Sequence, residues 1–79
     1  MYVYLLQSER APNQRYIGLT HDLSRRLREH NAGKSKHTSK FVPWRIVASI
    51  WLDNPEKATA LEVYLKRGSG HAFARKHLW

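Results

Sequence analysis

The stretch "YIGLTHDLSRRLREHNAG" (residues 16–33) begins as a strand, turns, and continues as a short helix. Leu23 and Leu27 are spaced four residues apart, so they define the helical face that meets the core. At 3.6 residues per turn, Arg26 and His30 fall on this same face. A guanidinium is costly to bury unless an anion lies beside it. The sequence therefore predicts an anionic group at this face of the helix.

The residues on either side of this stretch predict an α+β domain. Strands rich in β-branched and aromatic residues are expected at Tyr2–Gln7, Arg15–Thr20 and Trp44–Leu52. Helices are expected from a cap at Thr20 or Asp22 to Gly33, over Asn54–Gly68, and as a short last element within Ser69–Trp79. Polar loops are expected at Ser8–Gln14 and Lys34–Pro43. The order is β-β-α-β-α-α, with an antiparallel hairpin at its start.

The helix predicted over Asn54–Gly68 has the clearest boundary signals. Asn54 is a favoured N-cap residue, Pro55 suits the first helical position, and Gly68 is typical of a helix end. In the short helix that follows, the aromatic residues Phe73 and Trp79 are the expected anchors to the core.

The composition indicates a small, strongly basic domain. Fourteen Lys and Arg against six acidic residues in 79 give a net charge of +8, which favours a polyanionic partner such as nucleic acid. A basic surface that keeps a small protein soluble is the alternative. Cysteine is absent, which excludes disulfides and thiolate metal sites and is consistent with a cytoplasmic location. No apolar run approaches the roughly 20 residues of a membrane span, so no membrane contact is expected.

The first two predicted strands place tyrosines together. Alternation puts Tyr4 on one face of its strand and Val3 and Leu5 on the other. Tyr16 and Gly18 share a face of the next strand, and antiparallel pairing would bring Tyr16 close to Tyr4. Gly18 is expected where a side chain would crowd a neighbour. Ordinary core tyrosines with their hydroxyls at the rim are the alternative.

A carboxylate lies within the apolar stripe of the second long helix. Ala58, Leu61 and Leu65 define this stripe, and Glu62 falls inside it. A carboxylate that faces a core is held charged by a partner or a metal, or else becomes neutral. An internal Arg26–Glu62 ion pair is the structural alternative.

Together these residues suit phosphodiester chemistry if they meet at one surface. A glutamate can hold a divalent cation, and an arginine can neutralise the charge that develops on a phosphate. Tyrosine and histidine can move protons. By contrast, the five histidines lack the tight spacing of a zinc site.

These motifs resemble the GIY-YIG nuclease superfamily, most of all its small stand-alone bacterial members. The residues that carry the resemblance are "YVY" at 2–4, "YIG" at 16–18, Arg26, His30 and Glu62, and the likeness extends over nearly the whole chain. It implies a three-stranded antiparallel sheet flanked by helices, in one domain over residues 1–79. It also implies an endonuclease that cleaves DNA, with Mg²⁺ or Mn²⁺ as its cofactor.

The resemblance assigns a role to each of these residues. Tyr4 and Tyr16 would lie beside the attacking water, and Arg26 would hold the scissile phosphate. His30 would contact the phosphate or assist proton transfer, and Glu62 would bind the metal. The anion predicted beside Arg26 is then substrate phosphate.

The basic segment after the first helix offers further contacts to nucleic acid. Lys34, Lys36, His37 and Lys40 are expected to contact backbone phosphates, with a plain solvated loop as the alternative. DNA is the expected partner, and RNA is not excluded.

Two departures from the family pattern stand in this sequence. Tyr2 occupies the place of the first glycine in the motif, and no asparagine follows Asn54, where several members carry one. Two alternatives therefore accompany the nuclease reading. One is a module of the same fold that binds nucleic acid without useful cleavage. The other is an interaction protein whose Arg26–Glu62 pair is purely structural.

Overall fold

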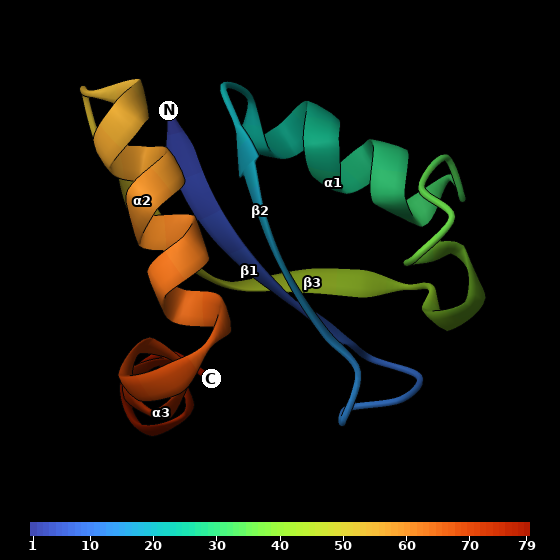
Figure 1. Cartoon of the computed structure of the whole chain (residues 1–79). Coiled ribbons are helices and arrows are strands. Elements are labelled where there is room, and N and C mark those ends of the chain that lie inside the picture. Colours follow the sequence, from blue (N-terminus) through green and yellow to red (C-terminus); the bar gives the residue numbers. More distant parts are fainter.

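The computed structural model describes residues 1–79 and contains three strands and three α-helices (Figure 1). The strands are β1 (Tyr2–Ser8), β2 (Arg15–Thr20) and β3 (Trp44–Trp51). The helices are α1 (Leu23–Asn31), α2 (Pro55–Lys66) and α3 (Gly68–His77), with a short 3₁₀ turn η1 (Ser39–Phe41). This order confirms the α+β prediction. No helix combines the length and the apolar composition that a bilayer crossing requires.

The three strands form one antiparallel sheet in the order β2-β1-β3. β1 is therefore the central strand, and β2 lies at an edge. Tyr4 is opposite Gly18, and Leu6 is opposite Tyr16. Tyr4 and Tyr16 are diagonal neighbours on one face, as the alternation predicted.

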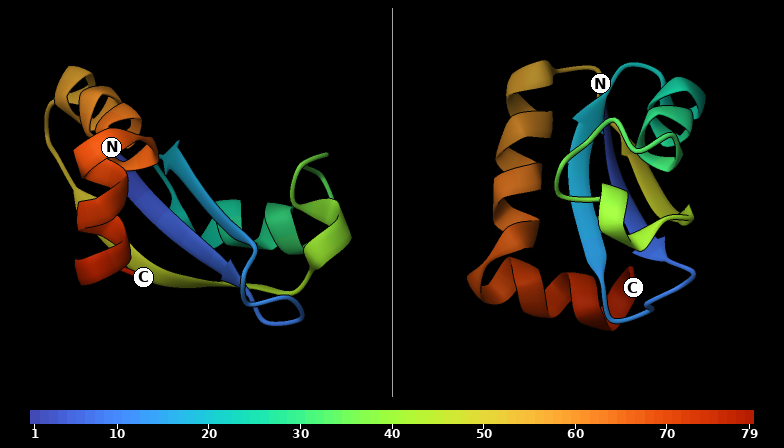
Figure 2. Two further views of the ribbon diagram at one scale, coloured as in Figure 1. Left: turned by 60° about the horizontal axis from the view of Figure 1, so that its bottom comes forward. Right: turned by 90° about the vertical axis from the view of Figure 1, so that its right-hand side faces the viewer.

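The helices cover the two faces of the sheet separately (Figure 2). α2 and α3 cover one face, where the buried apolar residues are Val3, Leu5, Ile17, Ala58, Leu65 and Ala74. α1 covers the other, where Leu23 and Leu27 pack against Tyr4, Leu6 and Trp44. The right-hand view of Figure 2 looks along the sheet from β2, with α2 on one side of the strand and α1 on the other.

Local caps set where the helices begin and end. Asp22 caps α1, because its Oδ1 accepts a hydrogen bond of 3.0 Å from the backbone nitrogen of Arg25. Thr20 supports this turn by accepting from the Asp22 backbone nitrogen at 3.1 Å. Gly33 follows the helix with a φ of 77°, in the left-handed region that glycine enters at no steric cost. Asn54 caps α2 as predicted.

One predicted anchor of α3 is wrong. Phe73 is 44% exposed, and its ring lies 4.8 Å from that of His77. Ala74 is fully buried instead, in one cluster with Ala58 and Leu65 of α2, because neighbouring residues of a helix point in different directions and only one of the two faces the core. Trp79, the other predicted anchor, does pack against the core.

The segment between α1 and β3 is more ordered than the plain loop that was predicted. Thr38 is buried, and its carbonyl accepts a hydrogen bond of 2.8 Å from Nε1 of Trp44. Ser8 donates its hydroxyl to the carbonyl of Phe41 at 2.6 Å. Asn31, at the end of α1, bonds both backbone polar groups of Trp44. These bonds hold the segment against α1 and the sheet.

Candidate active site

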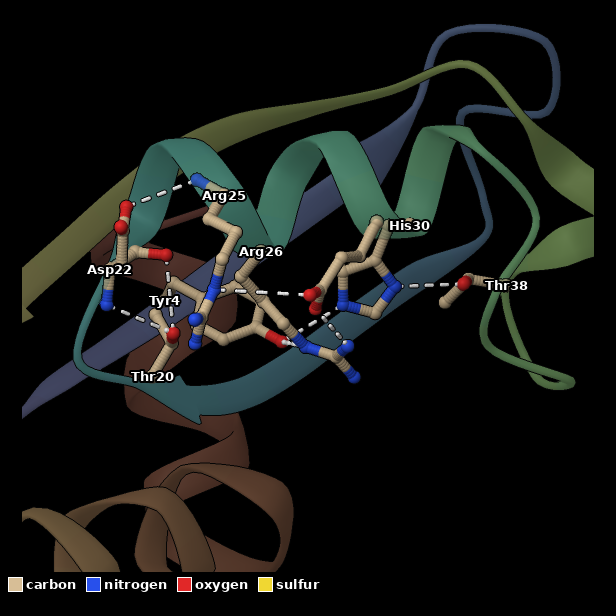
Figure 3. A network of polar contacts seen from close by, with 8 residues as sticks. Tyr4, Thr20, Asp22, Arg25, Arg26, His30 and Thr38 are labelled. Carbon is tan, nitrogen blue, oxygen red and sulfur yellow. Dashed lines mark hydrogen bonds and ion pairs between the residues drawn. The ribbon is translucent and has the colours of Figure 1, made fainter.

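A chain of hydrogen bonds connects α1, β1 and the 34–43 segment (Figure 3). The hydroxyl of Tyr4 lies 2.9 Å from Nε2 of His30, and Nδ1 of His30 lies 2.8 Å from the hydroxyl of Thr38. Nε of Arg26 donates to the same Tyr4 hydroxyl at 3.3 Å. Tyr4, His30 and Thr38 are all buried, and no buried side-chain polar atom in the structure lacks a partner. The chain is therefore a fully satisfied polar network.

This environment keeps Tyr4 and His30 neutral. Burial raises the pKa of Tyr4, with the hydrogen bond from Arg26 acting in the opposite direction. Burial also lowers the pKa of His30 to about 4, and the positive charge of Arg26 adds to the effect. At neutral pH a phenol and an uncharged imidazole thus lie beside a fixed guanidinium.

The ion pair of Arg26 is not the one proposed as the structural alternative. Nη1 of Arg26 donates to Glu29 at 2.9 Å, one helical turn along α1. This contact raises the pKa of Arg26 and lowers that of Glu29. Glu62 pairs with Lys66 on its own helix. The alternative of an Arg26–Glu62 ion pair is therefore wrong, because each of the two charged side chains pairs with a residue three or four positions away on its own helix.

Gly18 makes room for the two tyrosine rings. The ring centroids of Tyr4 and Tyr16 are 6.1 Å apart, and the Tyr16 ring lies 5.0 Å from that of His30. A Cβ on Gly18 would lie 2.5 Å from the Tyr4 hydroxyl oxygen and 2.8 Å from Cε2 of Tyr16. Only glycine allows both rings to occupy this face, as the sequence predicted.

Glu62 lies on α2, which packs on the face of the sheet opposite to α1 (Figure 2). Its side chain is 16% exposed. Tyr4, Tyr16, Arg26 and His30 therefore share a face, and the meeting of Glu62 with these four residues at one surface stays a prediction. Its ion-pair partner Lys66 lines the same cavity beside β2 as Tyr16 does.

Comparison with known proteins identifies the family. Residues 1–76 match the GIY-YIG catalytic domain. The chain belongs to this family. No solved structure gives a significant match.

Named relatives of this GIY-YIG domain fall into two groups. The structure-specific endonuclease subunit SLX1 of Scheffersomyces stipitis is 40% identical over 82 residues, which cover 96% of this chain and 24% of that protein. UPF0213 protein YsiG of Lactococcus lactis is 36% identical over 76 residues, covering 95% of this chain and 67% of that protein. UPF0213 protein H16_B0156 of Cupriavidus necator is 36% identical over 67 residues, covering 84% and 71%. The chain thus spans about a quarter of the SLX1 protein it matches.

The carboxylate of Glu62 suits one hard cation in this GIY-YIG domain. The structure has no cluster of three or more His, Asp or Glu side chains. Mg²⁺ does not need one, because it retains several waters and commonly takes one or two carboxylates plus substrate phosphates. Glu62, largely buried and paired with a single movable lysine, is a carboxylate of this kind.

The basic segment lies next to the polar network. Lys34, Lys36, His37 and Lys40 are all exposed, and they flank the buried Thr38. Their side chains are free to contact a ligand while the backbone between them is held in place.

Two residues of the network were missed by the sequence analysis. Thr38 stands in a segment without periodicity, and no local signal distinguishes it from the other polar residues there. Glu29 could have been found, because it stands three residues after Arg26 on a predicted helix, where opposite charges meet.

Proposed function

We propose that this GIY-YIG domain is a metal-dependent endonuclease that hydrolyses DNA phosphodiester bonds. The observation that carries the proposal is the guanidinium of Arg26, fixed between Glu29 and the hydroxyl of Tyr4 on the face of the sheet that α1 covers. A positioned arginine is the typical partner of a phosphate, and the net charge of +8 favours a polyanion. The name of the SLX1 relative, a structure-specific endonuclease subunit, supports the same reaction.

Arg26 would bind the scissile phosphate without giving up its present partners. A guanidinium carries five N–H donors. The contacts with Tyr4 and Glu29 use one donor on Nε and one on Nη1. The remaining donors are free for phosphate oxygens, so Glu29 and Tyr4 orient the arginine without competing with the substrate.

The two tyrosines would lie beside the attacking water. One of them would take its proton, as a general base does. His30 has a different task from the phosphate contact that was expected: both of its ring nitrogens are engaged, and the side chain is fully buried. His30 would therefore act as a positioning residue that holds the hydroxyl of Tyr4.

Glu62 would hold Mg²⁺ or Mn²⁺ after Lys66 moves aside. When bound, such an ion neutralises developing negative charge and activates water. The lysine pairs with the carboxylate when no ion is bound, which avoids the cost of an unpaired buried charge.

A cleavage assay tests this proposal. The purified chain is incubated with branched, nicked, single-stranded and duplex DNA, with Mg²⁺ or Mn²⁺ or with a chelator. We expect metal-dependent products that fall at least a hundredfold with Glu62→Gln and Tyr16→Phe. Glu56→Gln, an exposed site on the same helix with the same charge change, is the matched control. Equal cleavage by wild type and Glu62→Gln would refute the mechanism.

The Glu62–Lys66 pair favours one alternative, a module of the same fold that binds nucleic acid without cutting it. In that case the ammonium group permanently takes the place of the metal. The signature is salt-sensitive binding to DNA or RNA with no metal-dependent product. Lys66→Met, which removes the competing charge, would then not restore cleavage.

A further inference from the structure

The edge of β2 has a second feature that the proposed chemistry does not use. A cavity of about 260 Å³ opens between β2, α2 and α3. Its apolar lining comes from Ile17 and Leu65, and its aromatic lining from Tyr16 and Trp79. In the right-hand view of Figure 2, α3 crosses near the start of β2. The cavity therefore lies on the side of the sheet that α2 and α3 cover, whereas the polar network lies under α1.

The charges around this cavity favour an anion. Its remaining lining residues are Arg15, Lys66 and His71, and no acidic residue lines it. The guanidinium of Arg15 lies 5.1 Å from the centroid of the Trp79 ring, a cation–π contact that holds both groups at the opening. An aromatic surface beside a cation is the combination that binds unpaired nucleotides, through base stacking and phosphate contact.

The volume restricts what fits. Pockets for drug-sized ligands measure about 300–1,000 Å³, so this cavity suits one flat heterocycle better than a larger molecule. Enzymes that accept an unstacked base enclose it in a pocket of this character, between aromatic or apolar side chains. An extended peptide would instead need a groove that continues past the opening.

Tyr16 lies between the cavity and the candidate active site. It lines the cavity, while its ring contacts those of Tyr4 and His30 on the face that α1 covers. Lys66 lines the cavity as well and pairs with Glu62.

We infer that this cavity receives one unpaired nucleotide of the substrate, with its base against Trp79 and its phosphate near Arg15 and His71. The inference rests on the proposed function for its substrate, DNA. It makes the preferred substrate one that already contains an unpaired nucleotide, because a paired base must first be unstacked at a cost.

A double-mutant cycle tests the inference: one change removes a base from the DNA, and the other removes the ring of Trp79. A forked duplex carries a single 2-aminopurine, or a single abasic site, at each of the first four unpaired positions in turn. Binding is measured with a chelator present, so that no cleavage occurs. At one position we expect wild type to bind the abasic fork about tenfold more weakly than the intact fork. Trp79→Ala should bind these two forks equally well. 2-Aminopurine fluorescence at that position should change on binding only in wild type.

Controls separate this result from general damage. Trp51→Ala removes an exposed ring at the far end of the sheet and should keep the full abasic effect. Because Trp79 also packs against the core, Arg15→Gln provides a second test that spares the ring. It should weaken binding to the forked duplex about threefold, whereas Arg45→Gln, across β1 from it, should not.

The possible outcomes are distinguishable. An abasic effect of equal size in wild type and Trp79→Ala at every position, with no loss in Arg15→Gln, would overturn the inference even if cleavage is normal. Coupling between the base and Trp79 without cleavage of any substrate would support the cavity and refute the proposed nuclease activity.

Discussion

The hydroxyl of Tyr4 lies 2.9 Å from Nε2 of His30, although 26 residues separate them in the chain. Arg26 donates to this hydroxyl, which leaves the proton of Tyr4 free to bond Nε2. In the His30 tautomer that accepts this proton, Nδ1 carries the imidazole hydrogen and donates to Thr38. The orientation of the Tyr4 hydroxyl is therefore set from α1 and from the 34–43 segment together.

Removal of the Thr38 hydroxyl should weaken both the fold and the proposed reaction. Thr38→Val keeps the shape of the side chain and leaves Nδ1 of His30 buried without a partner. We expect the free energy of unfolding, measured in urea, to fall by about 1–3 kcal/mol. Thr38→Ser should recover most of it. kcat should fall more than KM changes, because Thr38 acts through Tyr4 and touches no substrate.

Thr59→Val is the matched control, since Thr59 is exposed on α2 and bonds only a backbone carbonyl. Its effect should stay within about 0.5 kcal/mol. If Thr38→Val and Thr59→Val were equally stable, the contact with His30 would have no energetic role.

A methyl group at Gly18 should disturb both tyrosines. Gly18→Ala places a Cβ 2.5 Å from the Tyr4 hydroxyl oxygen, a distance that no relaxed structure tolerates. Such overpacking costs about 1–3 kcal/mol, which thermal unfolding would report as a lower Tm. Ser49→Ala, on the opposite flank of Tyr4 in the register, adds no atom and should be near neutral. An unchanged Tm for Gly18→Ala would mean that the rings move aside freely.

The buried imidazole should make stability depend on pH. His30 has a pKa of about 4 in the folded chain and about 6.5 when unfolded, so the unfolded chain binds more protons between these values. The free energy of unfolding should therefore be highest above pH 6.5 and fall as the pH drops toward 4. The difference corresponds to about 3 kcal/mol.

Urea unfolding between pH 7.5 and 4.5 measures this loss. Tyr4 and Arg26, whose pKa values are both raised, stay in one protonation state throughout this range, and the lowered pKa of Glu29 contributes only below its ordinary value of 4.5. His21→Gln, which changes an exposed histidine, should keep the same slope. A flat wild-type curve from pH 6.5 to 4.5 would show that His30 takes up a proton without loosening the fold.

The basic segment should contribute to the salt dependence of DNA binding. For duplex DNA, log K falls linearly with log salt concentration, and each phosphate contact makes this slope steeper by about 0.9. Replacing Lys34, Lys36 or Lys40 singly with Gln should make the slope shallower by about that amount. Lys57→Gln, at the start of α2, is the control and should not change it. If all four variants kept the wild-type slope, the segment would not contact the backbone of DNA.

The local elements of this protein were predictable because short-range rules determine them. Asn54 and Pro55 begin α2, Gly33 ends α1, and alternation along β1 separates Tyr4 from Val3 and Leu5. Caps, turns and strand alternation depend on a few neighbouring residues, so a single sequence carries them. The family motifs likewise lie within these elements, and the match to the GIY-YIG catalytic domain confirms the family.

The contacts of Glu62, Thr38 and Phe73 required the tertiary structure. An amphipathic helix has the same apolar stripe whichever face of a sheet it covers. The helical periodicity of the sequence therefore could not show that α2 lies on the face opposite to α1. Nor could it tell that a loop threonine closes the network around His30. By itself, then, the sequence determined the elements, their ends and the apolar stripes of α1, α2 and β1. The three-dimensional packing decided which of them meet, because contacts between distant segments depend on how whole elements approach one another and not on spacing along the chain.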